Sequence, residues 1–229
     1  MATVENHLIE RLPRKDRARL LARCETLPLV LAEVLCDPGT AMNYAYFPVD
    51  GFVSMVATVA GSPGVEVGMV GREGMLGAHI ALGVDRAPLH ALVQGAGSAR
   101  RIGADDLRAE LEHSAALRDS VNRYLYVLLS QLATSAACLR FHLIGPRLAR
   151  WLLMSADRSH SDNFHVTQEF LAFMLGVRRV GITAAAGDLQ RAGLIEYHRG
   201  EITVLNRHAL QAAACSCYQT DRDGYDKLL

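Results

Sequence analysis

The sequence predicts an α+β fold with three successive parts: an N-terminal β-roll, a long helix, and a C-terminal winged helix-turn-helix. Three observations predict it. Short β-type runs fill residues 28–103, a helical apolar period runs from about residue 105 to residue 143, and two short amphipathic helices meet at Gly176. The expected domains are residues 1–114 for the β-roll with its N-terminal helix, 115–144 for the long helix, and 145–229 for the winged helix-turn-helix.

Residues 1–27 are expected to be helical, with Asn6 as a possible N-cap and Pro13 in a first turn. The arginine and lysine residues that follow Pro13 are typical of a solvated helix face. Residues 28–103 then alternate between strand-like runs and turn signals, which predicts the β-roll. The runs are LVLAEVL, YAYFPV, GFVSMVATV, VEVGMV, HALV and SARRI, and the expected turns are Asp37–Gly39, Asp50–Gly51, Gly61–Gly64 and Gly95–Gly97.

The long helix carries apolar side chains spaced by three or four residues, a near-heptad seam sustained over more than two heptads. Such a helix can simply cover the β-roll. We favour a homodimer seam, because one face cannot cover the roll and also support a separate domain without a partner. The residues expected at the dimer interface are Val121, Leu125, Leu128, Leu132 and Leu139. A further helix from Pro146 to about Asp157 carries Trp151, which is expected to pack.

Two short helices joined at Gly176 form the expected helix-turn-helix. Thr167 is a plausible N-cap of the first helix, and glycine takes the conformation of a tight turn without penalty. In the second helix, from about Arg178 to Ala192, the residues available to pack are Val180, Ile182, Ala186 and Leu189. Two strand-like runs, at residues 195–198 and 201–205, flank Arg199 and Gly200 as the wing.

Ordinary helical bundles also contain helix pairs joined by a glycine. The paired arginines that open the second helix, together with the hairpin that follows it, favour DNA binding, because arginine suits guanine edges and phosphates. The residues assigned to DNA contact are Thr167, Gln168, Arg178, Arg179, Val180, Thr183 and Arg199.

Composition and charge agree with this interpretation. The chain has 229 residues, of which 50% are hydrophobic and 21% charged, as in ordinary globular proteins. No apolar run reaches about 18 residues and no signal-peptide pattern opens the chain, so we expect a cytoplasmic protein without a membrane span. The net charge is +0, but residues 140–207 hold nine arginines against six acidic residues. This surplus lies on the segment with the helix-turn-helix.

The order of these parts resembles the Crp/Fnr superfamily of bacterial transcription regulators, as do the segments GFVSMV, GREGMLG, RLARWLL, FLAFMLGVRR and GLIEYHRGEI. The resemblance covers nearly the whole chain and is strongest over residues 147–205. It implies a homodimer that binds a palindromic operator in double-stranded DNA, a partnership with RNA polymerase, and a cyclic-nucleotide-binding-like sensor. Base-reading positions of the superfamily fall here on Arg179, Val180 and Ala184. Because the last two are short and apolar, the operator is expected to differ from that of the best-known members.

The effector pocket departs from the superfamily's pattern. Where cyclic-nucleotide-binding members have a glycine and a glutamate for the ribose, this chain has Gly77 and Ala78. Arg86 is followed by Ala87 and Pro88, so the hydroxyl that binds the cyclic phosphate is missing. We therefore expect a degenerate pocket, no response to cyclic AMP, and no cofactor. The glycines of GREGMLG can offer N–H groups to an anion, although a turn between strands explains them equally well. The pocket candidates are Val70, Leu76, Gly77, Ala78, Arg86 and Tyr124.

The five cysteines contain no closely spaced set of four metal ligands. Cys215 and Cys217 are the one suggestive pair, and they can share a metal only if a helix ends there. One interpretation of this pair is therefore a redox or metal site in a sensing regulator of the same fold. The other is that both cysteines are unpaired reduced thiols without such a role. His79, His90 and His142 lie near the expected sensor or the long helix, and no spacing among them supports a haem ligand.

Two further classes of protein are alternatives to a DNA-binding regulator. An enzyme on the β-roll is disfavoured, because the region has only two histidines and no dense ligand cluster, so no catalytic activity is expected. A non-enzymatic protein-interaction module is the second alternative. Arg178 and Arg179 at the start of the second helix favour DNA over that interpretation.

Overall fold

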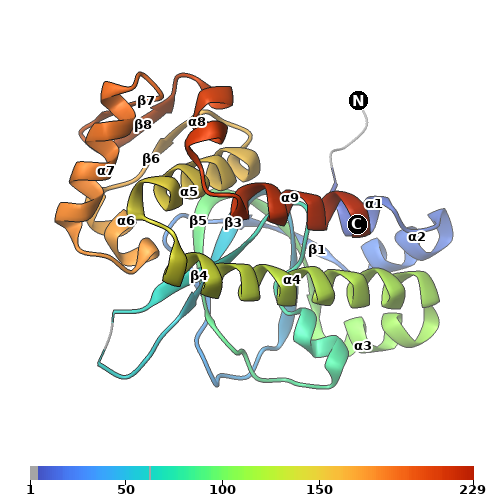
Figure 1. Ribbon diagram of the computed structural model, residues 1–229. Coiled ribbons are helices and arrows are strands. Elements are labelled where there is room, and N and C mark those ends of the chain that lie inside the picture. The colour runs from blue at the N-terminus through green and yellow to red at the C-terminus, as the bar shows by residue number, and fades with distance from the viewer. Residues whose placement is uncertain (1–4, 62) are drawn as a thin grey trace. The chain divides into compact units, whose positions relative to one another are not determined.

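The computed structural model describes residues 5–61 and 63–229 of the chain (Figure 1). The chain divides into two compact units. Of the described residues, one unit contains residues 5–55, 68–130 and 224–229, and the other contains residues 56–61, 63–67 and 131–223. The mixture of an N-terminal antiparallel sheet and C-terminal helices confirms the α+β fold class.

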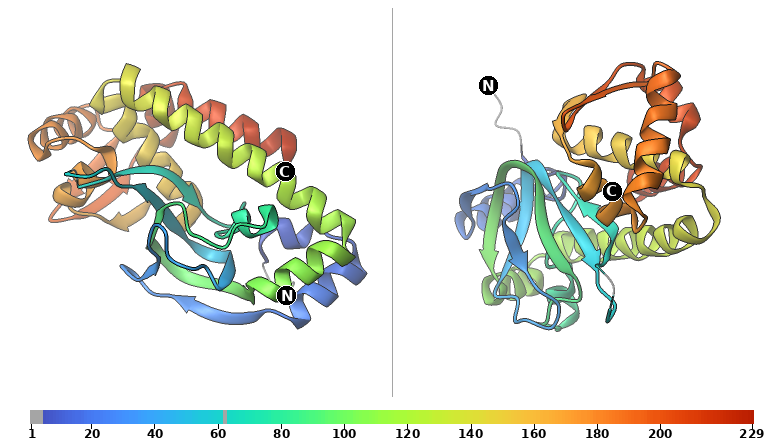
Figure 2. Two further views of the ribbon diagram at one scale, coloured as in Figure 1. Left: turned by 90° about the horizontal axis from the view of Figure 1, so that it is seen from below. Right: turned by 90° about the vertical axis from the view of Figure 1, so that its left-hand side faces the viewer.

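The first unit is built on a five-stranded sheet (Figure 2). Its strands are β1 (Glu25–Leu29), β2 (Val34–Cys36), β3 (Tyr44–Ala57), β4 (Val65–Val70) and β5 (His90–Gly103). The strand order is β1-β5-β3-β4, with β2 also paired to β5, and both β1 and β2 run antiparallel to β5. Pairing of this kind places segments that are far apart in the chain side by side.

Two expected turns are wrong, since they lie inside long strands. Asp50 and Gly51 belong to β3, and Gly95–Gly97 belong to β5. The two strands are neighbours, and a Cβ on Gly97 would overlap the backbone of Asp50. The absence of a side chain at these glycines therefore lets the backbones of β3 and β5 approach each other closely. Glycine inside a strand often marks such a close approach, so it need not indicate a turn. The expected turn at Gly61–Gly64 includes Ser62, which lies outside the described residues.

The expected single strand LVLAEVL is also wrong, because a turn divides it. Leu29 ends β1 and Val34 begins β2. Between them Ala32 takes a left-handed conformation with φ 67°, and the Glu33 amide donates to the Val30 carbonyl at 3.0 Å. Left-handed residues in turns are usually glycine or asparagine, and alanine is uncommon there. The residues of this turn therefore give no sign of it in the sequence. A short 3₁₀ helix, η1 (Ala78–Leu82), follows β4 and has no counterpart among the expected elements.

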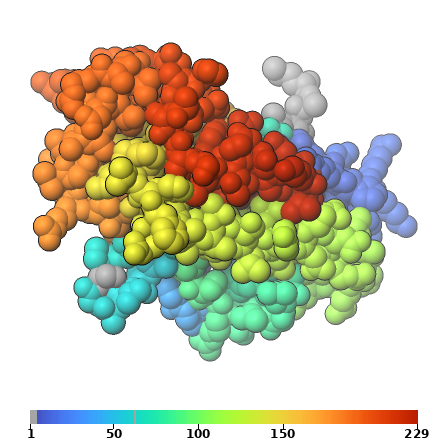
Figure 3. All heavy atoms as spheres, in the orientation of Figure 1, coloured from blue at the N-terminus to red at the C-terminus, as the bar shows by residue number. Residues whose placement is uncertain are grey.

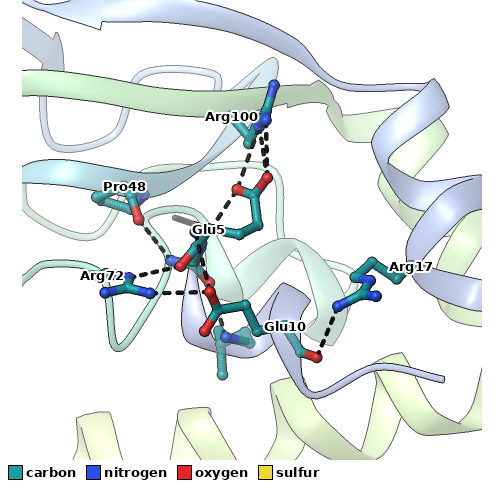
Figure 4. Close-up of polar contacts among 8 residues, drawn as sticks. Glu5, Glu10, Arg17, Pro48, Arg72 and Arg100 are labelled. Atoms are coloured by element: carbon teal, nitrogen blue, oxygen red, sulfur yellow. Dashed lines mark hydrogen bonds and ion pairs between the residues drawn. The ribbon is translucent and has the colours of Figure 1, made fainter. Parts of the chain in front are cut away.

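The N-terminal segment is held to the sheet by polar contacts (Figure 4). It forms α1 (His7–Glu10) and α2 (Arg14–Ala22). Asn6 caps α1 as expected, and its Nδ2 donates to the carbonyls of Pro48 at 2.9 Å and Gly74 at 2.8 Å. Arg72 donates to the Glu5 carbonyl and pairs with Glu10 at 3.0 Å, while Arg100 pairs with Glu5 at 2.9 Å. Pro13 is the N-cap of α2, one residue before its first turn.

The charged face of α2 is not simply solvated, which corrects the expectation. Arg19 pairs with Glu110 at 2.7 Å, and Arg23 pairs with the same carboxylate at 3.1 Å. Glu110 is only 1% exposed and lies in α3 (Ala104–His113). A buried carboxylate needs such partners, since desolvation would otherwise disfavour its charge.

The long helix is α4 (Ala115–Phe141), close to its expected range. In the first unit its buried residues Leu117, Val121 and Tyr124 join one apolar core with the sheet and α3. The ring of Tyr124 lies against Gly74, where any Cβ would overlap it. This end of α4 therefore covers the sheet, as a helix with one apolar face is expected to do.

The second unit contains the C-terminal helices and a small sheet. Its elements are the end of β3, the start of β4, the end of α4, α5 (Ile144–Ser159), β6 (Asn163–His165), α6 (Gln168–Leu175), α7 (Arg179–Arg191), β7 (Ile195–His198), β8 (Glu201–Val204), α8 (Arg207–Ala213) and the first part of α9 (Cys217–Leu228). Trp151 in α5 is 6% exposed and packs edge-on against Phe164 at 6.5 Å, so the expected packing role is confirmed. The third strand, β6, is not predicted by the sequence; it pairs with β8 in the order β6-β8-β7.

Candidate functional site

Helices α6 and α7 form a helix-turn-helix. Thr167 caps α6 by accepting a hydrogen bond from the Phe170 amide at 3.2 Å, as expected. Gly176 ends α6 with φ 61°, a left-handed conformation that glycine adopts without steric cost. The helices are bent by 107° relative to each other, which lies within the usual range for this motif. Among the described residues no single helix has the length and apolar character of a membrane span, although α6 and α7 counted together meet that test by length and composition.

The two sides of α7 differ sharply in burial. Ile182 is fully buried and Leu189 is 7% exposed, so this side packs into the domain as expected. The opposite side is exposed and presents Arg179, Val180, Thr183 and Ala184. Positions separated by three or four residues share a helix face, so these four side chains form one surface. We call this surface the α7 face.

Val180 corrects one expectation from the sequence. The sequence pattern groups it with the packing residues of the second helix, but its side chain is 72% exposed. The reason is rotation about the helix axis, because Val180 lies two residues before the buried Ile182 and therefore on the other side.

Few contacts restrain the polar residues of the α7 face. Thr183 donates to Gln168 Oε1 at 2.7 Å and so joins α7 to the start of α6. Arg179 lies 4.0 Å from Glu169, and both side chains are well exposed at 67% and 81%. An exposed ion pair of this length contributes little free energy, so the Arg179 guanidinium remains available to another anion. Arg178, the N-cap residue of α7, is also exposed.

The wing hairpin joins β7 and β8 through Arg199 and Gly200. Both residues have positive φ, 50° and 89°, which is the pattern of a type I′ turn. The expected hairpin is thereby confirmed, and Arg199 is exposed at its tip. The phenol of Tyr197 donates to the Val166 carbonyl at 2.7 Å, which fixes β7 to the segment before α6. Burial raises the pKa of this phenol to about 12, so it stays a hydrogen-bond donor at neutral pH.

The residues expected at the dimer seam lie in different surroundings along α4. Val121 is 0% exposed within a single chain and belongs to the core of the first unit, so it is not available to a partner subunit. Leu125 and Leu128 are half-buried against the same core, and Leu132 and Leu139 are half-buried farther along the helix. The apolar residues that α4 exposes most include Tyr126 at 64% and Leu129 at 66%. Figure 3 shows that α4 lies at the molecular surface.

The effector-pocket candidates all belong to the first unit, and most are buried. Val70 and Tyr124 are fully buried, and Leu76 and Ala78 are 6% and 2% exposed. Gly77 has φ 93° at the start of η1. Arg86 points elsewhere, because its guanidinium is exposed and donates to the Gly39 carbonyl at 3.0 Å. The Arg86 guanidinium is therefore not buried with the other candidates, and Ala78 brings no polar atom from its side chain.

Cys215 and Cys217 lie where helix α8 has ended and α9 begins. The condition under which the pair can share a metal is therefore met. Sequence reasoning missed that Cys138 and His142, more than 70 residues earlier, lie beside them. The signal present in the sequence was the spacing of four between Cys138 and His142, which places both on one side of a helix.

Comparison with known proteins agrees with this geometry. Residues 146–213 match the model of the Crp-like helix-turn-helix domain. No curated protein sequence matches the chain. Among solved structures, FixK2 from Bradyrhizobium japonicum has a TM-score of 0.71 at 14% identity, with 84% of this chain and 98% of that one covered. A transcriptional regulator of the Crp/Fnr family from Thermus thermophilus has a TM-score of 0.68 at 21% identity, with 83% and 98% covered.

The c-di-GMP-responsive regulator CLP from Xanthomonas campestris has a TM-score of 0.66 at 17% identity, with 84% of this chain and 99% of that one covered. The resemblance drawn from the sequence is confirmed. Residues 146–213 are a Crp-like helix-turn-helix domain, and the chain has the fold of the Crp/Fnr transcription regulators.

Proposed function

We propose that the chain is a sequence-specific DNA-binding transcription regulator of the Crp/Fnr type, acting in the cytoplasm. The observation that carries the proposal is the α7 face. It is exposed, it begins with Arg179 directly after the exposed N-cap residue Arg178, and it belongs to a helix whose other side is buried in a Crp-like helix-turn-helix domain. A helix in this position enters the major groove, where its first residues meet base edges.

The contacts divide into two kinds. Arg179 is the residue of the α7 face that can read guanine by two hydrogen bonds, and Val180 offers apolar contact to a thymine methyl group. Arg178 and Arg199, together with Thr167 and Gln168 at the start of α6, serve the phosphate backbone. Phosphate contacts position the protein, whereas base contacts give it specificity.

We further propose that two copies bind a palindromic operator, with α4 as the seam between them. The exposed Tyr126 and Leu129 are separated by three residues, so they form one apolar stripe on α4. Leu125, Leu128, Leu132 and Leu139 flank that stripe as half-buried neighbours. A two-fold dimer buries the same patch from both subunits, and its two α7 helices then read two half-sites. RNA polymerase is the further partner of such a regulator.

The sensor of the proposed regulator does not respond to cyclic AMP. Ala78 cannot accept a hydrogen bond from a ribose, and Arg86 is turned to the Gly39 carbonyl at the surface. Each missing charge-assisted hydrogen bond costs about 1.5–3 kcal/mol of binding free energy. Any ligand of this unit must therefore be recognised by other groups.

Retention on double-stranded DNA at two salt concentrations tests the proposal. A DNA-binding protein loses affinity steeply as salt rises, because each neutralised phosphate releases counterions. We expect strong retention at low salt and a marked loss at high salt, and charge reversal by Arg178→Glu with Arg179→Glu should abolish retention. A folded chain that is not retained on DNA at low salt would contradict the proposal and favour a protein-interaction module.

A further inference from the structure

Three cysteines and one histidine converge in the second unit. They are Cys138, His142, Cys215 and Cys217, and their sulfur and nitrogen atoms all lie within 4.8 Å of one another. The sulfurs of Cys138 and Cys215 are 3.6 Å apart, and the sulfur of Cys217 is 3.5 Å from His142 Nδ1. All three thiols are buried, with exposures of 2–7% for their residues. The helix-turn-helix uses none of these four residues.

Two separate segments supply the four groups. Cys138 lies in the last turn of α4, and His142 follows immediately after that helix ends, with its amide donating to the Cys138 carbonyl at 3.1 Å. Cys215 and Cys217 come from the break between α8 and α9. That break is fixed by a backbone hydrogen bond from the Cys215 amide to the Pro146 carbonyl at 3.2 Å. Backbone contacts thus help to hold both segments in place.

The geometry is that of a tetrahedral site. Zinc binds thiolate sulfur at about 2.3 Å and imidazole nitrogen at about 2.0–2.1 Å, so tetrahedral ligand atoms lie roughly 3.5–3.8 Å apart. Two separations in the cluster match these values, at 3.6 Å for sulfur to sulfur and 3.5 Å for sulfur to nitrogen. Atoms this close surround a single ion, whereas the ligands of an iron–sulfur cluster bind separate irons.

The charges around the cluster also favour a cation held by thiolates. Arg150 lies beside the cluster, where it pairs with the buried Asp221 at 2.6 Å and donates to Ser135 at 3.4 Å. Three thiolates with one zinc ion carry a net charge of −1, which this guanidinium offsets only in part, because it also pairs with Asp221.

We propose that Cys138, His142, Cys215 and Cys217 form a structural site for a single Zn²⁺ ion, which joins the end of α4 to the α8–α9 junction. Four protein ligands leave no open coordination position, so the site is closed to substrate and stabilises the fold. His142 Nδ1 faces a thiol of the same set, which assigns the histidine to this site and not to a haem. The proposal does not depend on DNA binding.

Metal analysis of the full chain, purified under reducing conditions, tests the site. We expect about one zinc ion per chain as isolated, in line with a single set of four ligands. After removal of the metal by a chelator, added Co²⁺ should give the intense sulfur-to-cobalt absorption of a tetrahedral thiolate site. Zn²⁺ should then displace the Co²⁺ and raise the melting temperature of the chain, since an ion that binds only the folded state stabilises it.

Matched variants locate the ion. Cys138→Ser and Cys215→Ser should each remove about one third of the cobalt–thiolate absorption and weaken Zn²⁺ binding at least tenfold, because each deletes one of three thiolates. Cys24→Ser and Cys36→Ser change cysteines outside the cluster, so they should leave both measurements unchanged. If a variant does not fold, the Co²⁺ spectrum of the wild-type chain still tests the proposal, because it reports thiolate ligands directly.

Two results would overturn the proposal. One is a reduced wild-type chain that binds neither Zn²⁺ nor Co²⁺. The other is a disulfide between Cys138 and Cys215 in protein from a reducing host, because it would make the cluster a thiol pair and leave too few ligands for the ion.

Discussion

Replacing Arg179 by alanine tests the role of the α7 face. The Arg179 side chain is 67% exposed, and its guanidinium forms an ion pair with Glu169 at 4.0 Å. Exposed pairs contribute about 0–1 kcal/mol, so Arg179→Ala should leave the folding free energy nearly unchanged. Loss of DNA affinity in this variant would therefore report a lost contact and not a damaged fold.

The expected loss can be worked out for a dimer. A bidentate arginine–guanine contact is worth about 1–3 kcal/mol, and two half-sites double it to about 2–6 kcal/mol, roughly a 30-fold to 10⁴-fold loss of affinity. Fluorescence anisotropy should show this loss on the selected operator and a much smaller loss on unrelated DNA. Arg191→Ala, at the far end of α7 and paired with Asp188, is the matched control and should change little. Equal loss on every sequence for Arg179→Ala would refute base reading by this residue.

Three further predictions follow from other parts of the chain. Leu129→Glu should convert the dimer to monomers in light scattering, because it places a charge in both halves of the seam, whereas Lys15→Glu, at an exposed position of α2, should not. An intact Leu129→Glu dimer would place the seam elsewhere. Calorimetry should detect no micromolar binding of cyclic AMP or cyclic GMP, and such binding with a matching gain in DNA affinity would contradict the degenerate pocket. Asn6→Ala should lower the unfolding free energy by about 2–4 kcal/mol in denaturant titrations, since it removes the cap of α1 and the buried donor to the Pro48 and Gly74 carbonyls. An unchanged denaturation midpoint would show that water takes over the hydrogen bonds of the Asn6 side chain.

Local signals explain why the helix-turn-helix could be predicted from the sequence. The cap at Thr167, the turn at Gly176 and the hairpin at Arg199 and Gly200 each depend on residues only a few positions apart. Caps and tight turns of this kind can be predicted from a sequence, because the residue types at these positions favour the conformation directly. Burial of Ile182 and Leu189 follows from the same helical period.

Long-range contacts explain most of what could not be predicted. Gly51 and Gly97 resemble turn residues, yet they lie in two strands whose backbones touch, and the sequence does not state which strands are neighbours. Arg19 and Arg23 resemble a solvated face, because their buried partner Glu110 lies in a helix far along the chain. The four groups of the proposed zinc site are likewise brought together only when the end of α4 meets the α8–α9 junction.

Selection of bound sites from a random pool of double-stranded DNA tests the central claim most directly. The full chain should enrich one palindromic sequence whose half-sites are centred about one helical turn, or a multiple of it, apart. Each half-site should contain a guanine whose preference disappears when selection is repeated with Arg179→Ala. Recovery of an unenriched pool by the folded, dimeric chain would contradict sequence-specific DNA binding.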